Sequence, residues 1–171
     1  MKNNKVIVHF LILAVFLISI TAISAADLND TADSDVLNDV GEKNSFNSLY
    51  DEINEKDSNF TFESDYDFNN ETDKNHSSGI SVNKDNFAIN GNNHKIDCKN
   101  QSRAFYITGK NVVITNLTIV NGFYGYGSAI RTDSSLTLNN VTFINCFGDG
   151  EKSNYGAVYS SRNSEIGRAH V

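Results

Sequence analysis

Apolar and polar residues alternate in short runs that recur along the second half of the chain. Segment 113–121 (Val-Ile-Thr-Asn-Leu-Thr-Ile-Val-Asn) aligns with segment 137–145 (Thr-Leu-Asn-Asn-Val-Thr-Phe-Ile-Asn), which gives a repeat of 24 residues. Each copy is followed by a glycine-rich loop and then by a small apolar pair, Ala129-Ile130 or Ala157-Val158. Self-similarity at this period indicates a repeat architecture in which each unit packs on the next.

The spacing of the apolar residues predicts a corner within each repeat. In segment 136–143 the apolar residues alternate up to Leu138 and again from Val141, but the step between these two is three residues. Both short strands can point inward only if the chain turns between them, at the pair that ends in Asn140. Asparagine tolerates the left-handed backbone that a tight corner needs. We therefore predict that Asn140 and its equivalent Asn116 are stacked corners.

These repeats favour one solenoid class over the other repeat architectures. A third, looser copy lies at 87–98, and no helix-length apolar period separates the copies. A propeller blade needs roughly 40 residues or more, which excludes it. We predict an all-β fold, a right-handed parallel β-helix with a short N-terminal capping helix, and assign its rungs to residues 80–161.

Residues 45–79 are predicted to form the N-terminal cap. Ser45 is a suitable N-cap for a short helix. The apolar residues that would share one face of this helix are Phe46, Leu49, Tyr50 and Ile53. Alternating aromatic residues predict edge strands near 60–62 and 66–68, and a polar loop follows at 69–78. An open first rung pairs with any extended segment, so a helix that covers it is expected.

Both ends of the chain differ from the repeats. Residues 1–26 resemble a secretory signal, with two lysines, an apolar run and small residues before a cleavage site after Ala26. The alternative is an uncleaved membrane anchor, because the run approaches the length that spans a bilayer. Residues 27–44 are acidic and aperiodic, which predicts a flexible leader. Residues 162–171 show no alternating pair and are expected to be a non-native tail on a truncated array.

The charge of the chain limits its partners. The net charge is −7, and loss of Lys2 and Lys5 with the signal would bring it to about −9. An acidic chain repels nucleic acid and anionic lipids, so no nucleic-acid partner is expected. Contact with a membrane is expected only through the signal segment, if it is uncleaved. The sequence thus predicts a secreted or cell-surface protein.

With the rungs aligned, the chain resembles the adhesin-like surface proteins of methanogenic archaea. The motifs that carry this resemblance lie at 91–97, 102–107, 116–122 and 141–146. The resemblance implies an exported, pectin-lyase-like solenoid that attaches to polysaccharides of the cell surface or environment, or to other cells. It assigns no catalytic residue and no cofactor. The chain departs from the family pattern at 127–130 and 155–158, where Gly-Gly-Ala-Ile would be usual.

Parallel β-helices also include polysaccharide lyases and glycoside hydrolases, so an enzyme is the alternative. Such catalysis uses paired carboxylates, or acidic calcium ligands beside a basic residue. The charged residues considered for this role are Asp97, Arg103, Asp133, Asp149 and Glu151. Charges that keep a solenoid soluble explain them equally well, since fold alone does not imply function. We therefore favour a noncatalytic adhesin over an enzyme, and both over a structural surface stalk.

The two cysteines and His94 are expected to be structural. Cys98 and Cys146 end comparable strands two rungs apart. Rungs stack at ~4.8 Å, so the two thiols would lie about 10 Å apart, beyond the reach of a disulfide. His94 shares the inward phase of its strand, and no second ligand repeats at metal spacing. No metal site is predicted.

The two glycine-rich loops are the predicted ligand-binding site. They leave equivalent points of successive rungs and should stack on one side, where aromatic faces and polar groups suit sugars. The candidate residues are Phe123, Tyr124, Tyr126, Asp149, Glu151 and Tyr155. The alternative is that these rings pack over the edge of the rungs.

The chain also carries Asn-X-Ser/Thr sequons that an exported protein could have glycosylated. They begin at Asn29, Asn59, Asn70, Asn75, Asn100, Asn116 and Asn140. We predict modification at Asn70 or Asn75, in the polar loop, in preference to the two corner residues, whose side chains should be engaged along the stack.

Overall fold

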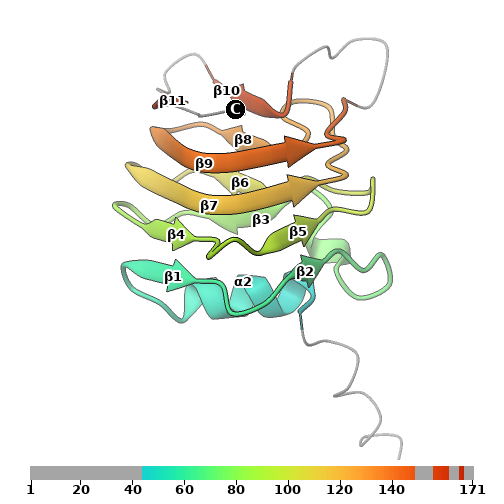
Figure 1. Ribbon diagram of the computed structural model, residues 1–171, viewed down its shortest axis with the longest axis horizontal. Coiled ribbons are helices and arrows are strands. Elements are labelled where there is room, and N and C mark those ends of the chain that lie inside the picture. The colour runs from blue at the N-terminus through green and yellow to red at the C-terminus, as the bar shows by residue number, and fades with distance from the viewer. Residues whose placement is uncertain (1–43, 149–155, 162–165, 168–171) are drawn as a thin grey trace, which may run out of the picture. The chain divides into compact units, whose positions relative to one another are not determined.

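The computed structural model describes residues 44–148, 156–161 and 166–167, most of which lie in short parallel strands (Figure 1). Its elements, in chain order, are α2 (Phe46–Asn54), β1 (Asn59–Thr61), β2 (Tyr66–Asp67), the 3-10 helix η1 (Lys74–His76), β3 (Ile80–Val82), β4 (Ala88–Asn90), β5 (Lys95–Asp97), β6 (Phe105–Ile107), β7 (Val112–Val120), β8 (Ile130–Thr132), β9 (Leu136–Ile144), β10 (Val158–Ser160) and β11 (Ile166–Gly167).

The strands form two sheets between which the chain alternates. In the four-stranded sheet the order is β10-β8-β6-β3, and in the seven-stranded sheet β7 joins β4 and β5 to β9. All the pairs between these strands are parallel. Each turn of chain therefore stacks on the preceding one (Figure 1). The predicted all-β fold, a parallel β-helix with a short capping helix, is confirmed.

The strand register reproduces the period of the sequence. Val112 pairs with Leu136 and Leu117 pairs with Val141, an offset of 24 residues on both sides of the corner. In the four-stranded sheet Ile130 pairs with Val158, an offset of 28 residues. The longer offset follows from the longer loop of the second repeat.

The predicted corners are present, but each lies inside one bent strand and not between two separate ones. Asn116 and Asn140 have φ angles of 52° and 53°, the left-handed conformation that the corner requires. Asn140 Nδ2 donates to Asn116 Oδ1 at 2.9 Å, and Asn116 Nδ2 donates to Asn90 Oδ1 at 3.3 Å. We call these three residues the asparagine ladder. Parallel hydrogen bonding between β7 and β9 continues on both sides of the corner, so the corner interrupts neither strand.

The core consists of inward rows of aliphatic side chains that stack from turn to turn. Ile89, Ile114 and Leu138 occupy one row and are at most 1% exposed. Val141 lies beyond the corner in the next row and is equally buried. Full burial of such a side chain stabilises the fold by roughly 1.5–3 kcal/mol.

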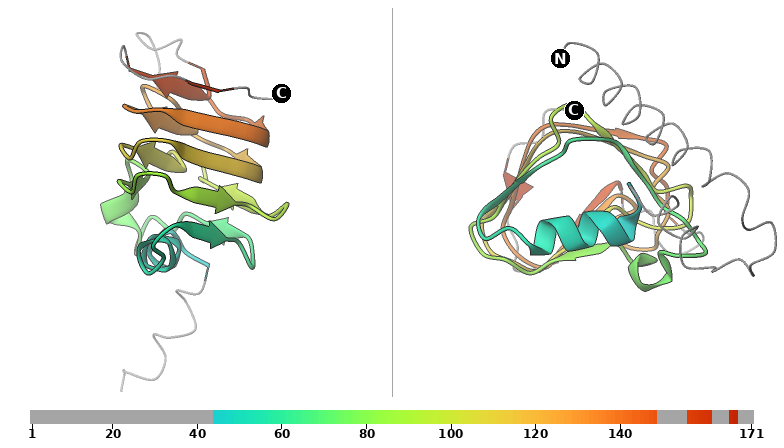
Figure 2. Two further views of the ribbon diagram at one scale, coloured as in Figure 1. Left: turned by 90° about the vertical axis from the view of Figure 1, so that its left-hand side faces the viewer. Right: turned by 90° about the horizontal axis from the view of Figure 1, so that it is seen from below.

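Helix α2 covers the first turn, as the sequence predicts (Figure 2). Ser48 N donates to the side chain of Ser45, the N-cap, and the buried face includes Leu49 and Ile53. The polar loop that follows β2 is not merely a loop. It contains η1 and the fully buried Asp73, whose carboxylate accepts the N–H groups of Phe46 and Asn47 at 3.1 and 3.0 Å. Asp73 thus satisfies further donors of the first helical turn.

The predictions for the chain ends fall largely outside the described residues. The signal segment, the leader up to residue 43, and the tail at 162–165 and 168–171 are not described. Ile166–Gly167 does form a strand, β11, which pairs with β9, so the stack continues past Ser161 where the sequence pattern predicts no rung. Within the described ranges, no helix has the length and apolarity to cross a membrane.

Candidate functional site

A row of polar and aromatic side chains runs along the outer face of the four-stranded sheet. Ser81 of β3 pairs with Tyr106 of β6, Tyr106 with Arg131 of β8, and Arg131 with Tyr159 of β10. Their neighbours in β6 and β8 are fully buried, so alternation along each strand turns the row toward solvent. We call these four residues the tyrosine–arginine row.

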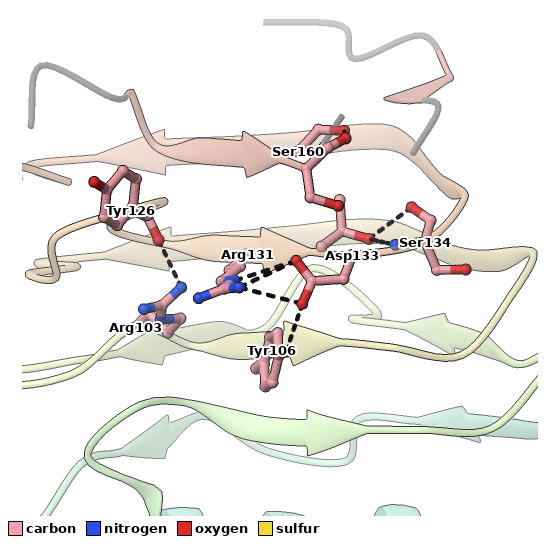
Figure 3. Close-up of polar contacts among 9 residues, drawn as sticks. Arg103, Tyr106, Tyr126, Arg131, Asp133, Ser134 and Ser160 are labelled. Carbon is pink, nitrogen blue, oxygen red and sulfur yellow. Dashed lines mark hydrogen bonds and ion pairs between the residues drawn. The ribbon is translucent and has the colours of Figure 1, made fainter. Parts of the chain in front are cut away.

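One carboxylate links two members of the row. Tyr106 Oη donates to Asp133 Oδ2 at 2.5 Å, and Arg131 Nη2 donates to the same oxygen at 3.2 Å (Figure 3). The guanidinium carbon of Arg131 also lies 5.0 Å from the centre of the Tyr106 ring. Asp133 therefore fixes the positions of a ring and a cation on adjacent rungs.

Each group in this cluster is stabilised in its usual protonation state. Burial raises the pKa of Asp133, but hydrogen bonds from Tyr106 and Arg131 outweigh it, and the net pKa is lowered. The hydrogen bond to Asp133 raises the pKa of Tyr106. Burial lowers the pKa of Arg131, but Asp133 reverses this and the net pKa is raised. None of the three is tuned toward neutral pH, where a general acid or base works best.

Arg103 lies to the side of Arg131 (Figure 3) and is not a surface charge. Its side chain is buried, and Nη1 donates to the carbonyl oxygen of Tyr126 at 2.6 Å. Its guanidinium carbon lies 3.9 Å from the centre of the Tyr124 ring, a cation–π contact. A Cβ at Gly79 would come within 2.5 Å of Arg103 Cγ, so the glycine makes room for the arginine stem. Arg103 thus anchors the first glycine-rich loop.

The predicted loop residues divide between two places. Tyr124 and Tyr126 lie beside the row, and the Tyr126 ring is 5.2 Å from that of Tyr159. Phe123 instead bridges to Phe147 of the next rung, which confirms that the two loops begin one above the other. Phe123 and Phe147 are 39% and 61% exposed.

Three of the predicted binding residues, Asp149, Glu151 and Tyr155, lie outside the described residues.

Asp97, another residue considered for catalysis, belongs to the other sheet. It is buried and accepts hydrogen bonds from Asn121 Nδ2 at 2.9 Å and Lys99 Nζ at 3.1 Å. Lys99 also pairs with Asp67 at 3.0 Å. The expectation that Asp97 and Arg103 are surface charges is wrong, since both are buried. Asp97 and Asp133 lie on different sheets, each within its own network.

The two cysteines differ in burial, and neither is in a disulfide. Cys98 is buried, Cys146 is half-buried, and both are free thiols. Burial raises the pKa of each thiol. His94 differs from expectation: its half-exposed ring lies outside the core, with Nδ1 3.2 Å from Asp65. In the part of the chain that the structure describes, no three His, Cys, Asp or Glu side chains are grouped to hold a metal ion.

An open groove of about 590 Å³ leads from the cap to the row. One wall comes from α2 and the other from η1 and its flank, through Asn47, Tyr50, Asp51, Asn75 and His76. Ser81 and Tyr106 of the row line its far end. The groove therefore ends at the first two residues of the row, an arrangement that the sequence pattern did not reveal.

These features define the chain as a parallel β-solenoid protein with a solvent-facing row of tyrosine and arginine. No protein-family model, curated protein or solved structure matches it.

Proposed function

We propose that this chain is a noncatalytic, adhesin-like module of the cell surface that binds glycans along the tyrosine–arginine row. The observation that carries the proposal is the stacking of Tyr106, Arg131 and Tyr159 in register on one outer face. Aromatic faces cover the apolar faces of sugar rings, and charged or amide groups take their hydroxyls. Stacked rungs repeat such contacts along a line, which suits a polymer.

The wider setting of this proposal comes from the sequence. The signal-like pattern of residues 1–26 supports export, and the partner is then a polysaccharide of the cell surface or environment, or another cell. We also propose that the coil is right-handed and pectin-lyase-like. The general rule that parallel strands in one sheet are joined by right-handed crossovers supports this.

Binding is favoured over polysaccharide cleavage because the row lacks a group suited to proton transfer. Asp133, with its lowered pKa, is a weak base, and Tyr106, with its raised pKa, resists ionisation. Asp97 is held in a separate network on the other sheet. A lyase or glycosidase needs groups whose pKa values are shifted toward the working pH.

A polysaccharide panel tests the proposal against its alternatives. The purified chain is incubated with pectins, glucans and host glycans, and both retention and soluble product are measured. Retention without product supports the adhesin, product indicates a lyase or hydrolase, and neither outcome indicates a structural stalk.

Two variants test whether the glycan binds at the tyrosine–arginine row. The double variant Tyr106→Ala, Arg131→Ala should no longer retain the glycan, because it removes a ring and a cation of the row. The matched control Lys99→Ala removes a cation from the other sheet and should retain the glycan. Equal loss of glycan retention in both variants would show that the binding site does not lie on the row.

A further inference from the structure

Arg131 of the tyrosine–arginine row and two neighbours outside it, Arg103 and Asp133, together carry one net positive charge, in contrast to the acidic chain as a whole. Arg103 and Arg131 are neighbours on adjacent rungs, and Asp133 is the one carboxylate paired with either of them among the described residues. The local balance is thus one positive charge, in a chain whose net charge is −7. Positive charge concentrated in this way attracts anions.

Within residues 44–148, 156–161 and 166–167, no acidic side chain balances the charge of Arg103. Arg103 is 2% exposed, and its Nε has no hydrogen-bond partner. Its contacts are the Tyr126 carbonyl and the Tyr124 ring, neither of which is a carboxylate. Buried arginines are normally paired with an acid, because an unpaired buried charge is unfavourable. A ligand anion close to Arg103 would supply the missing counter-charge.

Arg131 is placed to contact such an anion directly. Its side chain is 37% exposed, and its Nε and Nη2 atoms donate hydrogen bonds to Asp133. The guanidinium group lies between Arg103 and Asp133, so its remaining edge is on the Arg103 side (Figure 3). The Tyr106 ring flanks this position, with its centre 5.0 Å from the guanidinium carbon, and the Tyr126 ring lies farther away, beyond Arg103 (Figure 3).

We propose that the row binds an acidic glycan, whose anionic group is held by Arg131 beside the buried charge of Arg103. This inference rests on the proposed glycan-binding function and specifies its ligand class. Arginine recognises carboxylate and sulfate oxygens through charge-assisted hydrogen bonds, while the flanking ring stacks on the sugar. The glycan class is therefore one with uronate or sulfate-bearing sugars.

Calorimetric titration of the full chain tests this with four ligands. They are an oligogalacturonate, its methyl ester, a sulfated galactan and a neutral galactan. The acid form should bind at least about tenfold more tightly than the ester, because the ester lacks the charge that a guanidinium group recognises. Its affinity should fall as sodium chloride is raised, since salt screens exposed charges. Preference for the sulfated galactan would support the same site and identify sulfate as the anionic group.

Two variants should change the affinity in opposite directions. Arg131→Gln should weaken binding of the acid form roughly tenfold, and Asp133→Asn should strengthen it roughly fivefold, because the second removes a repelling carboxylate. The control Lys99→Gln, on the other sheet, should leave the affinity unchanged. If Arg131 and Asp133 acted only by maintaining the local structure, both Arg131→Gln and Asp133→Asn would weaken binding. If Arg131→Gln fails to fold, Arg131→Lys replaces it in the test. This variant keeps the charge but loses the planar guanidinium group, so it should bind the acid form more weakly than the unmodified chain and less than about tenfold more weakly.

The outcomes separate this inference from the function on which it rests. Equal affinity for the acid, its ester and the neutral galactan would overturn the acidic ligand and leave glycan binding intact. Weaker binding in both Arg131→Gln and Asp133→Asn would also overturn it. Failure to bind any of the four, or any member of the polysaccharide panel, would overturn both.

Discussion

The asparagine ladder and the tyrosine–arginine row both run along the stack, yet their sequences behave in opposite ways. The ladder has the same residue type at all three positions. The row has serine, tyrosine and arginine at its first three positions, Ser81, Tyr106 and Arg131. At Asn116 and Asn140 the backbone is left-handed, and the side-chain amides of the three ladder residues bond to one another. In the row the backbone is ordinary strand, so the side chain is free to vary. Repetition thus marks positions that the fold requires, and variation marks positions available for recognition.

A charge placed inside the coil should disrupt both regions at once. Val141→Asp puts a carboxylate at a position that is 1% exposed and pairs with Leu117. We expect a loss of at least about 3 kcal/mol in the free energy of unfolding, because an unpaired buried charge is strongly unfavourable. Chemical denaturation measures it. The neighbouring Thr142 is exposed, so Thr142→Asp is the control and should change stability by less than about 1 kcal/mol. Similar melting of both variants would contradict the inward phase.

Substitution within the ladder should cost less than this, but more than substitution in the row. Asn116→Ala loses two amide hydrogen bonds and strains a φ of 52°, and should destabilise by about 1–3 kcal/mol. Asn116→Gly keeps the backbone conformation and should recover part of that loss. Tyr106→Phe, in the row, should change stability by less than about 1 kcal/mol. Thermal and urea unfolding of the three variants give the ranking. A larger loss for Tyr106→Phe would remove the distinction between the two regions.

Acid should weaken each sheet through its own aspartate. Burial raises the pKa of Asp97, but hydrogen bonds from Asn121 and Lys99 bring the net pKa below its ordinary value, and Asp133 behaves likewise. A lowered folded-state pKa means that the unfolded chain binds more protons below about pH 4. The stabilisation is therefore present above that pH and is lost as the pH falls through the folded-state pKa. Unfolding by urea between pH 2 and 6, roughly the range that brackets these values, measures it.

The corresponding amide variants separate the two contributions. Asp97→Asn and Asp133→Asn should each show a shallower decline of stability in acid than the unmodified chain. A decline that neither substitution alters would show that other carboxylates cause it.

Glycosylation should distinguish the corners from the polar loop without affecting stability. Glycan attaches to Nδ2, and Nδ2 of both Asn116 and Asn140 already donates within the ladder. Asn70 and Asn75 are exposed in the loop around η1. In a host that modifies the chain, mass spectrometry should find glycan at Asn70 or Asn75. Glycan at the two corners with none in the loop would refute the ranking.

The fold was predictable wherever a pattern repeats or a local rule applies. The three-residue step before Val141 locates the corner, and Ser45 before an apolar face locates α2. Asp73 was not predictable as a second cap, because it contacts the helix from 27 residues away. The continuation of each strand through its corner was not predictable either, because the spacing of apolar residues does not show which backbone groups are hydrogen-bonded. Two residues of β11 are too few to show an alternation.

The candidate site was predictable only in part. Tyr124 and Tyr126 are conspicuous in a glycine-rich loop and do lie beside the row. The row itself is spread over strands of three residues, joined at unequal offsets, so no short pattern contains it. The sequence shows that Arg103 is charged but not that it is buried, because its burial depends on the space left by Gly79.

The asparagine ladder also bears on how the protein ages. Asn-Gly pairs such as Asn90-Gly91 are prone to deamidation, in which the following backbone nitrogen attacks the side-chain amide and ammonia is released. Here Gly91 N donates to Thr115 O at 2.7 Å, and Asn90 Oδ1 accepts from Asn116 Nδ2 and from Asn92 N. Both reacting groups are thus held by separate partners on the stack. These contacts should slow deamidation of Asn90 while the coil is folded, so the chemical lifetime of the Asn90-Gly91 pair should depend on the stability of the fold.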